Sequence, residues 1–449
     1  MVGIGGIGMQ ALADVLLAIG HQITGSDIVE FSGKVRLIQK GAKVIIGPQV
    51  AGNVPDNIDG LIYTSAILHH QKNHAEVEQA KQLNVPVWKR SEFIGELMKS
   101  KYSIAVSGTH GKTTTSTLLT LMLQAGGLDP TALIGAEVKS LTGCGILGKS
   151  KYMVVEACEY DRAFLDMVPT VAVLTSIEAD HLDYYQDLAE IKQAFIEFLN
   201  KVPVDGYVVV YGDDPNIQAI LPQVKPHIIT FGFGENNDVR LSDISYDNDR
   251  MHFTIDNLSG YMHFPGRHLV LDAAAAMIVA RQLGVSDDTI KQVLEQDFKG
   301  ANRRFEILGT YNGVTFVDDY GHHPTEIKMA LAAAKDFFSG RRIIVIFQAH
   351  QYSRTRLLLD DFAVSFADAD QVWLAPILAV RDSAEDIASI NAGVLAQRIN
   401  QHSHNARVFS DFPTISQKLP LELNPGDVVI SMGAGHNSEW VHEFISQYQ

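Results

Sequence analysis

A glycine-rich turn at residues 107–115 carries the side chains of this sequence best suited to phosphate chemistry. It reads SGTHGKTTT, follows the apolar run 102–106 and precedes a helix-like stretch, 115–124. The backbone N–H groups of such a turn, with the N-terminus of the next helix, form a cradle for polyphosphate. A lysine adds positive charge there, and a threonine hydroxyl can reach Mg²⁺. The turn therefore predicts an ATP site made of Gly108, Thr109, His110, Gly111, Lys112, Thr113 and Thr114.

The spacing of this turn departs from the common phosphate-binding loop. Only Thr109 and His110 separate its two glycines, whereas the common motif has four residues between them. The alternative interpretation is an ordinary glycine-rich connection between a strand and a helix. We favour the phosphate loop because the strand, the turn and the Lys112-Thr113 pair occur together.

A second glycine motif lies at the start of the chain. Gly3, Gly5 and Gly8 have the spacing of a dinucleotide fingerprint, and Asp27 follows where a second strand would end. The motif alone leaves the ligand open between NAD and another pyrophosphate, such as a UDP-sugar. Only two residues precede it, too few for a first strand, so we expect further residues upstream. The apolar first twenty residues lack a basic flank, which favours a turn and a helix over a signal peptide or membrane span.

Acidic side chains follow two predicted strands near the phosphate loop. Glu156 closes the strand 153–156, and the run Glu178-Ala179-Asp180-His181 follows the strand 171–175. Mg²⁺ prefers oxygen ligands, so a carboxylate beside phosphates is ordinary and a histidine ligand is unusual. Glu156 and His181 are candidate ligands, with surface residues at strand ends as the alternative.

Histidines, a tyrosine and an arginine gather after two strands further along the chain. One strand leads into DDYGHHP, residues 318–324, and the next into QAHQYSR, residues 348–354. Adjacent strand ends would bring these groups to one crevice, which suits a carboxylate and an amine that exchanges a proton. The pattern predicts a second substrate pocket, with core or surface histidines as the alternative.

Composition limits the class of protein. The 449 residues are 46% hydrophobic and 20% charged, an ordinary globular balance with room for about three domains. The net charge of −16 argues against nucleic acid as a partner. Two cysteines, Cys144 and Cys158, suggest a reducing compartment. We expect a cytoplasmic protein that is not embedded in a membrane.

Periodicity divides the chain into three α/β segments, 1–98, 99–302 and 303–449. The first alternates short strands with helices, and the second carries the phosphate loop, a polar β stretch at 239–264 and a helix at 270–283. In the third, helices alternate with strands predicted at 314–317, 343–347, 372–374, 407–409 and 428–432. This last pattern indicates a doubly wound sheet, whose ligands lie at the carboxyl ends of its strands.

Together these motifs resemble the Mur ligase family, and within it the members that join L-alanine to UDP-N-acetylmuramate. GTHGKTTT and DDYGHHPTEI are specific, whereas the glycine fingerprint is not. The matches occur in family order across all three segments: GIGGIGM (3–9), SGTHGKTTT, EADHLD (178–183), Arg303-Arg304-Phe305, DDYGHHPTEI (318–327) and the stretch 347–355.

The resemblance implies an ATP-dependent amide ligase of peptidoglycan precursor biosynthesis, with ATP and Mg²⁺ as cofactors. ATP would phosphorylate the carboxylate of UDP-N-acetylmuramate, and the amine of L-alanine would attack the acyl phosphate. The implied domains are a Rossmann-like UDP-sugar domain (1–98), a central ATP domain with a P-loop ATPase-type mixed sheet (99–302) and a Rossmann-like C-terminal domain (303–449). The last would bind the amino acid and close over ATP, which excludes water.

Carried over residue by residue, the resemblance assigns roles to the motifs. The catalytic set is Lys112, His181, His322, His350 and Arg354. The Mg²⁺ set is Thr113, Glu156 and His181, while Arg304 reaches the ATP phosphates and Asp319 the ribose. The UDP-sugar set is Gly5, Gly6, Ile7, Gly8, Asp27 and Ser65. The amino-acid set is Tyr320, His322, His350 and Arg354.

The chain departs from the family pattern at several of these places. The family often has Asn at the positions of Leu269 and Asp272. This chain therefore has fewer carboxamide groups that could hydrogen-bond to the adenine edge. It often has arginine at Gln351, which leaves carboxylate binding mainly to Arg354. Two further differences are Cys158 and His436, where the family often has aspartate.

Three other readings stay open at this point. A related ligase would add a whole peptide to the same sugar nucleotide, but its histidine motif typically has alanine where Gly321 and Glu326 stand here. A catalytically silent nucleotide-binding protein is favoured only by Leu269 and Gln351. A dehydrogenase depends on the N-terminal fingerprint alone, and the second glycine loop argues against it.

Overall fold

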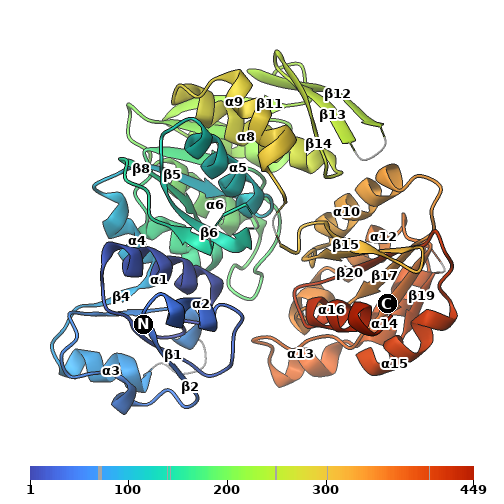
Figure 1. The fold of residues 1–449 in the computed structure, drawn as a ribbon, viewed down its shortest axis with the longest axis horizontal. Coiled ribbons are helices and arrows are strands. Elements are labelled where there is room, and N and C mark those ends of the chain that lie inside the picture. The colour runs from blue at the N-terminus through green and yellow to red at the C-terminus, as the bar shows by residue number, and fades with distance from the viewer. Residues whose placement is uncertain are drawn as a thin grey trace.

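The computed structural model describes residues 1–68, 73–138, 140–141, 143–247, 250–300, 302–403 and 405–448. Figure 1 shows three lobes in chain order: a blue N-terminal lobe, a central lobe in cyan to yellow, and an orange to red C-terminal lobe. Strands and helices alternate through all three, so the predicted α/β class is confirmed. In the part of the chain described, we find no helix of the length and apolar character that a bilayer requires.

The N-terminal lobe is built on short parallel strands. Val2 bridges both Ser26 of β1 and Tyr63 of β3, so one residue joins the pairs β1–β2 and β3–β4. The glycine turn follows Val2 directly and leads into α1, at the carboxyl edge of these strands. The elements are β1 (Thr24–Asp27), β2 (Lys43–Ile46), β3 (Leu61–Tyr63), β4 (Val87–Lys89), α1 (Ile7–Ile19), α2 (Lys34–Gln39), α3 (Ala75–Gln82) and α4 (Arg90–Met98).

A ten-stranded sheet forms the central lobe, in the order β14-β13-β12-β11-β10-β9-β5-β8-β6-β7. Its middle strands are parallel and almost wholly buried, as their valine-rich sequences require. Its strands are β5 (Tyr102–Ser107), β6 (Thr131–Val138), β7 (Gly143–Ile146), β8 (Tyr152–Glu156), β9 (Val171–Leu174), β10 (Tyr207–Tyr211), β11 (His227–Gly232), β12 (Val239–Asp247), β13 (Arg250–Ile255) and β14 (Leu258–Met262). Its α-helices are α5 (Lys112–Ala125), α6 (Leu188–Leu199), α7 (Pro215–Ile220), α8 (Arg267–Gln282) and α9 (Asp287–Gln292).

The C-terminal lobe has a six-stranded sheet in the order β15-β16-β20-β17-β18-β19, antiparallel only at the β15–β16 edge. The strand order reverses at β20, the last strand in the sequence. Its strands are β15 (Glu306–Tyr311), β16 (Val314–Asp319), β17 (Ile343–Phe347), β18 (Gln371–Leu374), β19 (Ala406–Val408) and β20 (Val428–Met432). Its helices are α10 (Pro324–Phe337), α11 (Tyr352–Leu357), α12 (Leu359–Ser365), α13 (Ala384–Ser389), α14 (Ala392–Asn400), α15 (Phe412–Lys418) and α16 (Asn437–Tyr448).

Strand positions agree closely with the sequence prediction, whereas two helix starts do not. The strands predicted at 343–347 and 428–432 coincide with β17 and β20. Helix α5 begins at Lys112 rather than at 115, and α8 begins at Arg267 rather than at 270. In both cases a glycine with positive φ, Gly111 or Gly266, precedes the helix and fixes its start.

Candidate active site

The phosphate loop connects β5 to the first residue of α5. Gly108 and Gly111 have φ of 138° and 82°, a region that favours glycine. Side chains also crowd both positions, because a Cβ at Gly108 would overlap the Thr175 hydroxyl and one at Gly111 would overlap Asp272. The loop therefore has the glycine-dependent, side-chain-poor backbone that a polyphosphate cradle needs.

Lys112 lies at the head of α5 and turns back over the loop. Its Nζ donates to the carbonyls of Gly108 and Thr109, and it lies 3.1 Å from Oε2 of Glu159. Burial alone would lower the pKa of this ammonium group, but the surrounding groups, Glu159 foremost and Glu156 among them, together outweigh burial and raise it. Lys112 is thus a fixed positive charge above the loop, as its predicted role requires.

The three predicted Mg²⁺ ligands lie at the mouth of the same loop. The Thr113 hydroxyl donates to Oε2 of Glu156 at 3.0 Å, so the two side chains face one point. His181 follows β9, and its buried Nδ1 has no hydrogen-bond partner in the described structure. Glu159 lies beside it, 3.9 Å from Nε2 of His181. Hydroxyl and carboxylate oxygens are the donors that Mg²⁺ prefers, so Thr113 and Glu156 fit that ion, whereas the imidazole of His181 is the less usual ligand.

A cavity of about 180 Å³ opens beside the phosphate loop, between α8 and the C-terminal lobe. Arg304 and Asp319, predicted at the phosphates and the ribose, both line it, as do His110, Gly111, Thr113 and Thr114 of the loop. Apolar side chains form the rest of the wall, including Leu269, Leu271, Phe305, Met329 and Ala330. The two lobes therefore share one cavity, and Leu269 adds apolar surface where the family often has a carboxamide.

Two carboxyl groups in this cavity are buried and hold raised pKa values. Burial raises the pKa of Asp319 to about 6, and its two oxygens accept the N–H groups of Phe305 and Gly321 at 2.8 and 2.7 Å. Burial also raises the pKa of Asp272 to about 7, against the bond that Thr115 donates to it. Asp319 thus shapes the loop after β16 in addition to lining the cavity.

The predicted amino-acid residues come together, although not by the route we expected. Strands β16 and β17 are not adjacent, because β20 lies between them. The rings of His322 and His350 nevertheless lie 6.0 Å apart, and Tyr320 packs edge-on against His322. Burial lowers the pKa of His322 to about 3 and that of His350 to about 4, so both are neutral imidazoles. Neutral imidazoles can accept a hydrogen bond from an ammonium group.

The glycines after β20 explain how these groups meet across the intervening strand. A Cβ at Gly433 would lie 2.5 Å from the carbonyl oxygen of Gln348, and one at Gly435 would overlap the Gln348 side chain. Gln348 Oε1 in turn accepts the N–H of His436 at 2.8 Å. Small residues at 433 and 435 therefore let the loops after β20 and β17 touch.

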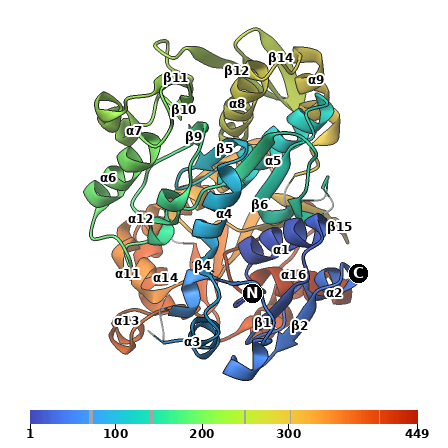
Figure 2. The same cartoon turned by 90° about the vertical axis from the view of Figure 1, so that its left-hand side faces the viewer.

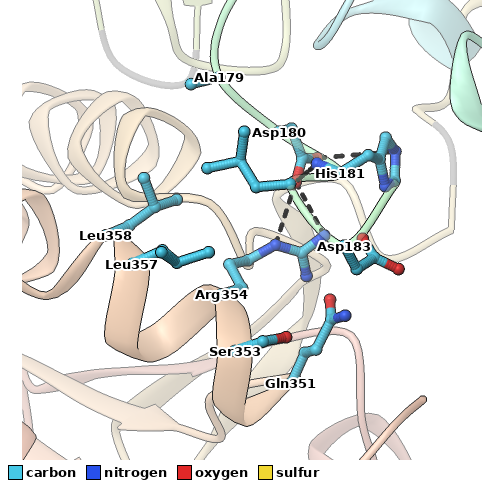
Figure 3. A pocket seen from close by; sticks show the side chains of 10 residues that line it. Ala179, Asp180, His181, Asp183, Gln351, Ser353, Arg354, Leu357 and Leu358 are labelled. Atoms are coloured by element: carbon cyan, nitrogen blue, oxygen red, sulfur yellow. Dashed lines mark hydrogen bonds and ion pairs between the residues drawn. The ribbon is translucent and has the colours of Figure 1, made fainter. Parts of the chain in front are cut away.

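Arg354 is buried at the seam between the central and C-terminal lobes (Figure 3). Its Nε and Nη2 both donate to Oδ1 of Asp180, at 3.1 and 2.9 Å. Burial would raise the pKa of Asp180, yet His181 and Arg354 hold it well below its usual range. The arginine predicted to bind the amino-acid carboxylate thus already contacts a carboxylate of the other lobe.

The glycine turn of the N-terminal lobe lies at a shared strand edge with Asp27 and Ser65. Oδ2 of Asp27 accepts the N–H of Gly5 at 2.7 Å, and Ser65 starts the turn after β3. A Cβ at Gly8 would lie 2.8 Å from Nη1 of Arg90, whose pKa burial lowers. This guanidinium therefore lies between the glycine turn and the central lobe, where an anion would stabilise it.

Four charged residues of the site were given no role from the sequence: Arg90, Glu159, Glu178 and Glu326. Glu178 stands in a run named above, and Glu159 follows the strand that Glu156 closes, so both positions carried a signal in the sequence. Glu326 lies inside a quoted motif but was given no role. Arg90 follows β4 and carries no local signal, because its partner loop is some eighty residues away in the sequence.

The fold and the site together define a three-domain α/β nucleotide-binding protein with two phosphate-type glycine loops and a site shared between lobes. Comparison with known families agrees with this class. Residues 1–102 match the Mur ligase family catalytic domain, 106–280 the Mur ligase middle domain and 303–435 the Mur ligase glutamate ligase domain. The chain belongs to the Mur ligase family.

Individual relatives cover nearly the whole chain. The UDP-N-acetylmuramate–L-alanine ligase of Clostridium kluyveri is 41% identical over 441 residues, which are 97% of this chain and 94% of that protein. The enzyme of the same name from Caldanaerobacter subterraneus subsp. tengcongensis is 40% identical, covering 99% and 96%. Among solved structures, UDP-N-acetylmuramate-alanine ligase MurC from Thermotoga maritima superposes with a TM-score of 0.83 at 26% identity, covering 100% of this chain and 98% of that one.

Proposed function

We propose that this chain is the ATP-dependent ligase that joins L-alanine to UDP-N-acetylmuramate, releasing ADP and phosphate. The observation that carries the proposal is the convergence of three sites at one seam. The phosphate loop, the Thr113–Glu156–His181 set and the pocket of Tyr320, His322 and His350 all lie at carboxyl strand ends of two facing lobes. Relatives at 40–41% identity carry the name of this reaction.

The residues divide the chemistry between the lobes. ATP occupies the cavity beside Gly111, and Lys112 stabilises charge as the terminal phosphoryl group moves to the muramoyl carboxylate. Mg²⁺, held by Thr113, Glu156 and His181, supplies charge neutralisation at the phosphates when bound. The neutral imidazoles of His322 and His350 accept hydrogen bonds from the incoming amine and orient it toward the acyl phosphate.

We assign the sugar nucleotide to the N-terminal lobe. The Gly5 to Gly8 turn receives the pyrophosphate, Asp27 fixes the turn by accepting from Gly5, and Arg90 supplies the positive charge. The working domain limits are 1–98 for this function, 99–302 for ATP and 303–449 for amino-acid binding and closure. Small-molecule partners, a net charge of −16 and two free cysteines are consistent with the cytoplasm and with no nucleic-acid partner.

The test is ADP release by the purified protein with UDP-N-acetylmuramate, ATP, Mg²⁺ and a panel of amines. We expect release with L-alanine and formation of the corresponding amide, detected by mass. Lys112→Ala should lower the rate about 10²-fold or more, corresponding to about 2.7 kcal/mol for one electrostatic contact. Release only with a peptide amine would assign the peptide-adding reaction instead, and NADH oxidation without ADP release would assign a dehydrogenase.

A further inference from the structure

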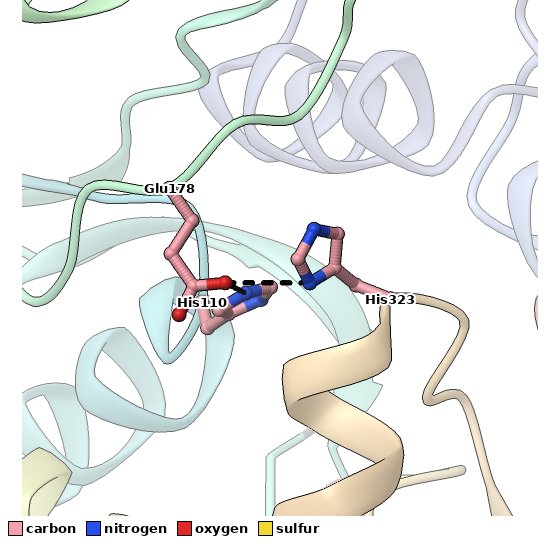
Figure 4. A group of neighbouring side chains, drawn as sticks. All are labelled: His110, Glu178 and His323. Carbon is pink, nitrogen blue, oxygen red and sulfur yellow. Dashed lines mark hydrogen bonds and ion pairs between the residues drawn. The ribbon is translucent and has the colours of Figure 1, made fainter. Parts of the chain in front are cut away.

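The seam between the phosphate loop and α10 contains an imidazole, that of His110, whose side chain has no role in the proposed reaction. Nδ1 of His110 lies 3.2 Å from Oε1 of Glu326 on α10, and its Nε2 lies 3.4 Å from Oε2 of Glu178 after β9. We call these three side chains the inter-lobe triad. His323, the residue before α10, packs its ring 4.9 Å from that of His110. Figure 4 shows His110 and Glu178 from the central lobe facing His323 from the C-terminal lobe.

The triad pairs opposite charges across the seam and is only partly exposed, with Glu178 the most exposed side chain at 29%. The His110 and Glu326 side chains are 14% and 13% exposed. Burial alone would depress the pKa of His110, but Glu326 and Glu178 outweigh it and raise that pKa to about 10. Both ring nitrogens therefore carry protons that point at carboxylates. A buried, doubly hydrogen-bonded cation of this kind is costly to break on one side only.

The same cluster could be read as a metal site. His110, Glu178 and His323 each offer a ligand atom, all within 4.8 Å of one another. Other polar partners within the protein already face these ligand atoms, however, including Oε2 of Glu178, 3.4 Å from Nδ1 of His323. The Thr325 hydroxyl donates to Oε2 of Glu178 at 2.6 Å, and the Thr325 N–H donates to Nδ1 of His323 at 3.4 Å. A proton on His110 completes this network without a fourth ligand.

The backbone ties the triad to the parts of the site that must move together. On the central side, the backbone N–H of His110 donates to the Ser176 hydroxyl at 2.9 Å, so this bond ties the phosphate loop to the segment after β9. On the C-terminal side, Oε1 of Glu326 also lies 3.5 Å from Nη1 of Arg304, which lines the nucleotide cavity. Contact between Glu326 and His110 therefore also positions Arg304 beside the ATP cavity.

We propose that His110, as an imidazolium shared by Glu178 and Glu326, is a positioning residue that holds the C-terminal lobe closed over the phosphate loop. It acts through Arg304 and contributes to turnover rather than to the initial binding of ATP. The proposal rests on the proposed ligase function for its kinetic test only, because lobe closure can be measured without catalysis.

The test is a double-mutant cycle with His110→Ala and Glu326→Gln. Glutamine keeps an oxygen that can accept from the start of α10, so the helix cap is retained while the charge is removed. We expect each variant to lower kcat for ADP release by about 10-fold to 100-fold, with the KM for ATP within a few-fold. The double variant should be no slower than the slower single variant. His110→Gln, which keeps a donor, should restore part of the rate.

Lobe closure is measured in a separate experiment, as the radius of gyration in solution with a non-hydrolysable ATP analogue and Mg²⁺. The wild type should contract, and both single variants should not. The matched control is His436→Ala with Glu439→Gln, an exposed histidine–glutamate pair 3.6 Å apart in the same lobe, which should change neither readout.

The outcomes separate the ideas. Additive single effects, wild-type kcat in both variants or normal contraction of both variants would overturn the role of His110. Contraction that needs added Zn²⁺ and disappears with a zinc-selective chelator would show that the cluster binds a metal. That result would also overturn the role of His110. A wild type that contracts but releases no ADP with L-alanine would refute the proposed function while leaving the positioning role tested by contraction alone.

Discussion

The interface between the N-terminal and central lobes and the interface between the central and C-terminal lobes are held by different kinds of contact. Helix α1 packs on β6 and β7 of the central lobe and shares one apolar core with that lobe. Figure 2 shows α1 beside β6. At the other seam, the hydrophobic clusters of the C-terminal lobe contain only residues from 305 onward among those described. Charged and polar contacts join that lobe instead, including His110–Glu326, Arg354–Asp180 and Arg381–Asp183.

The difference indicates which lobe can move. Apolar burial is non-directional and is lost as soon as two surfaces separate, so the N-terminal and central lobes should behave as one body. Ion pairs and hydrogen bonds can be exchanged for water at much smaller net cost. The C-terminal lobe is therefore the one expected to open for substrate and close for chemistry.

The largest effect is expected at Arg354, in the polar seam. Arg354→Ala removes both bonds to Asp180 and the only predicted guanidinium of the amino-acid pocket. We expect the KM for L-alanine to rise about 100-fold, because the amino-acid carboxylate loses its charged hydrogen-bond partner, at a cost of about 2.7 kcal/mol. Initial rates with each substrate varied in turn measure this, and the KM values for ATP and the UDP-sugar should stay within a few-fold.

Arg381→Ala is the matched control for that variant. Arg381 also crosses the polar seam, with Nε 3.5 Å from Oδ2 of Asp183. If Arg354 only ties the lobes together, the two variants will raise all three KM values alike. A defect confined to L-alanine in Arg354→Ala would place the carboxylate clamp there.

Gly145→Ala should break the apolar seam. A Cβ at this position of β7 would overlap the carbonyl oxygen of Ala11 in α1, so the helix must shift away from the sheet. Overpacking of this kind costs about 1–3 kcal/mol, and we expect a lower melting temperature by calorimetry. Gly52→Ala, where nothing lies within 4 Å of the added atom, serves as the control and should melt like the wild type. Equal melting of both variants would mean that α1 is not held by this contact.

A rise in pH should loosen only the polar seam. The pKa of His110 is raised to about 10 in the closed structure, so its contribution is fully present below its ordinary value of about 6.5 and is lost as pH rises toward 10. The groups that face it are Glu178, Glu326 and His323, with Arg304 and Asp272 nearby. The radius of gyration with the ATP analogue should therefore increase between pH 7 and 10. Glu326→Gln should flatten that profile, and a profile unchanged by this variant would remove the triad as its cause.

The smallest effect is expected from Asp272→Asn in the nucleotide cavity. Burial raises the pKa of Asp272 to about 7, so ionisation destabilises the folded state progressively from about pH 4 up to pH 7. The variant should melt about 2–4 °C higher than the wild type at pH 8, corresponding to about 1 kcal/mol for a domain of roughly 200 residues. The difference should vanish at pH 4. A constant difference at both pH values would exclude ionisation as its origin.

Local sequence was sufficient for the strands and the phosphate loop but not for the seam. Buried strands such as β10 and β17 are continuous apolar runs, and the Gly108 to Lys112 turn encodes its own geometry. The position of β20 between β16 and β17 could not be predicted from the sequence, because strand order depends on the packing of the whole lobe. The pairing of Arg354 with Asp180 joins residues 174 positions apart, and no periodicity reports such a contact.

Glu326 links the folding of one lobe to the working of two. Its Oε2 accepts the N–H groups of His322 and His323 and so begins α10, while its Oε1 faces His110 across the seam. Evolution therefore cannot adjust the helix start and the closing contact separately at this position. A substitution at residue 326 that improves one of these contacts must also preserve the other. We therefore expect few residue types to be tolerated at this position.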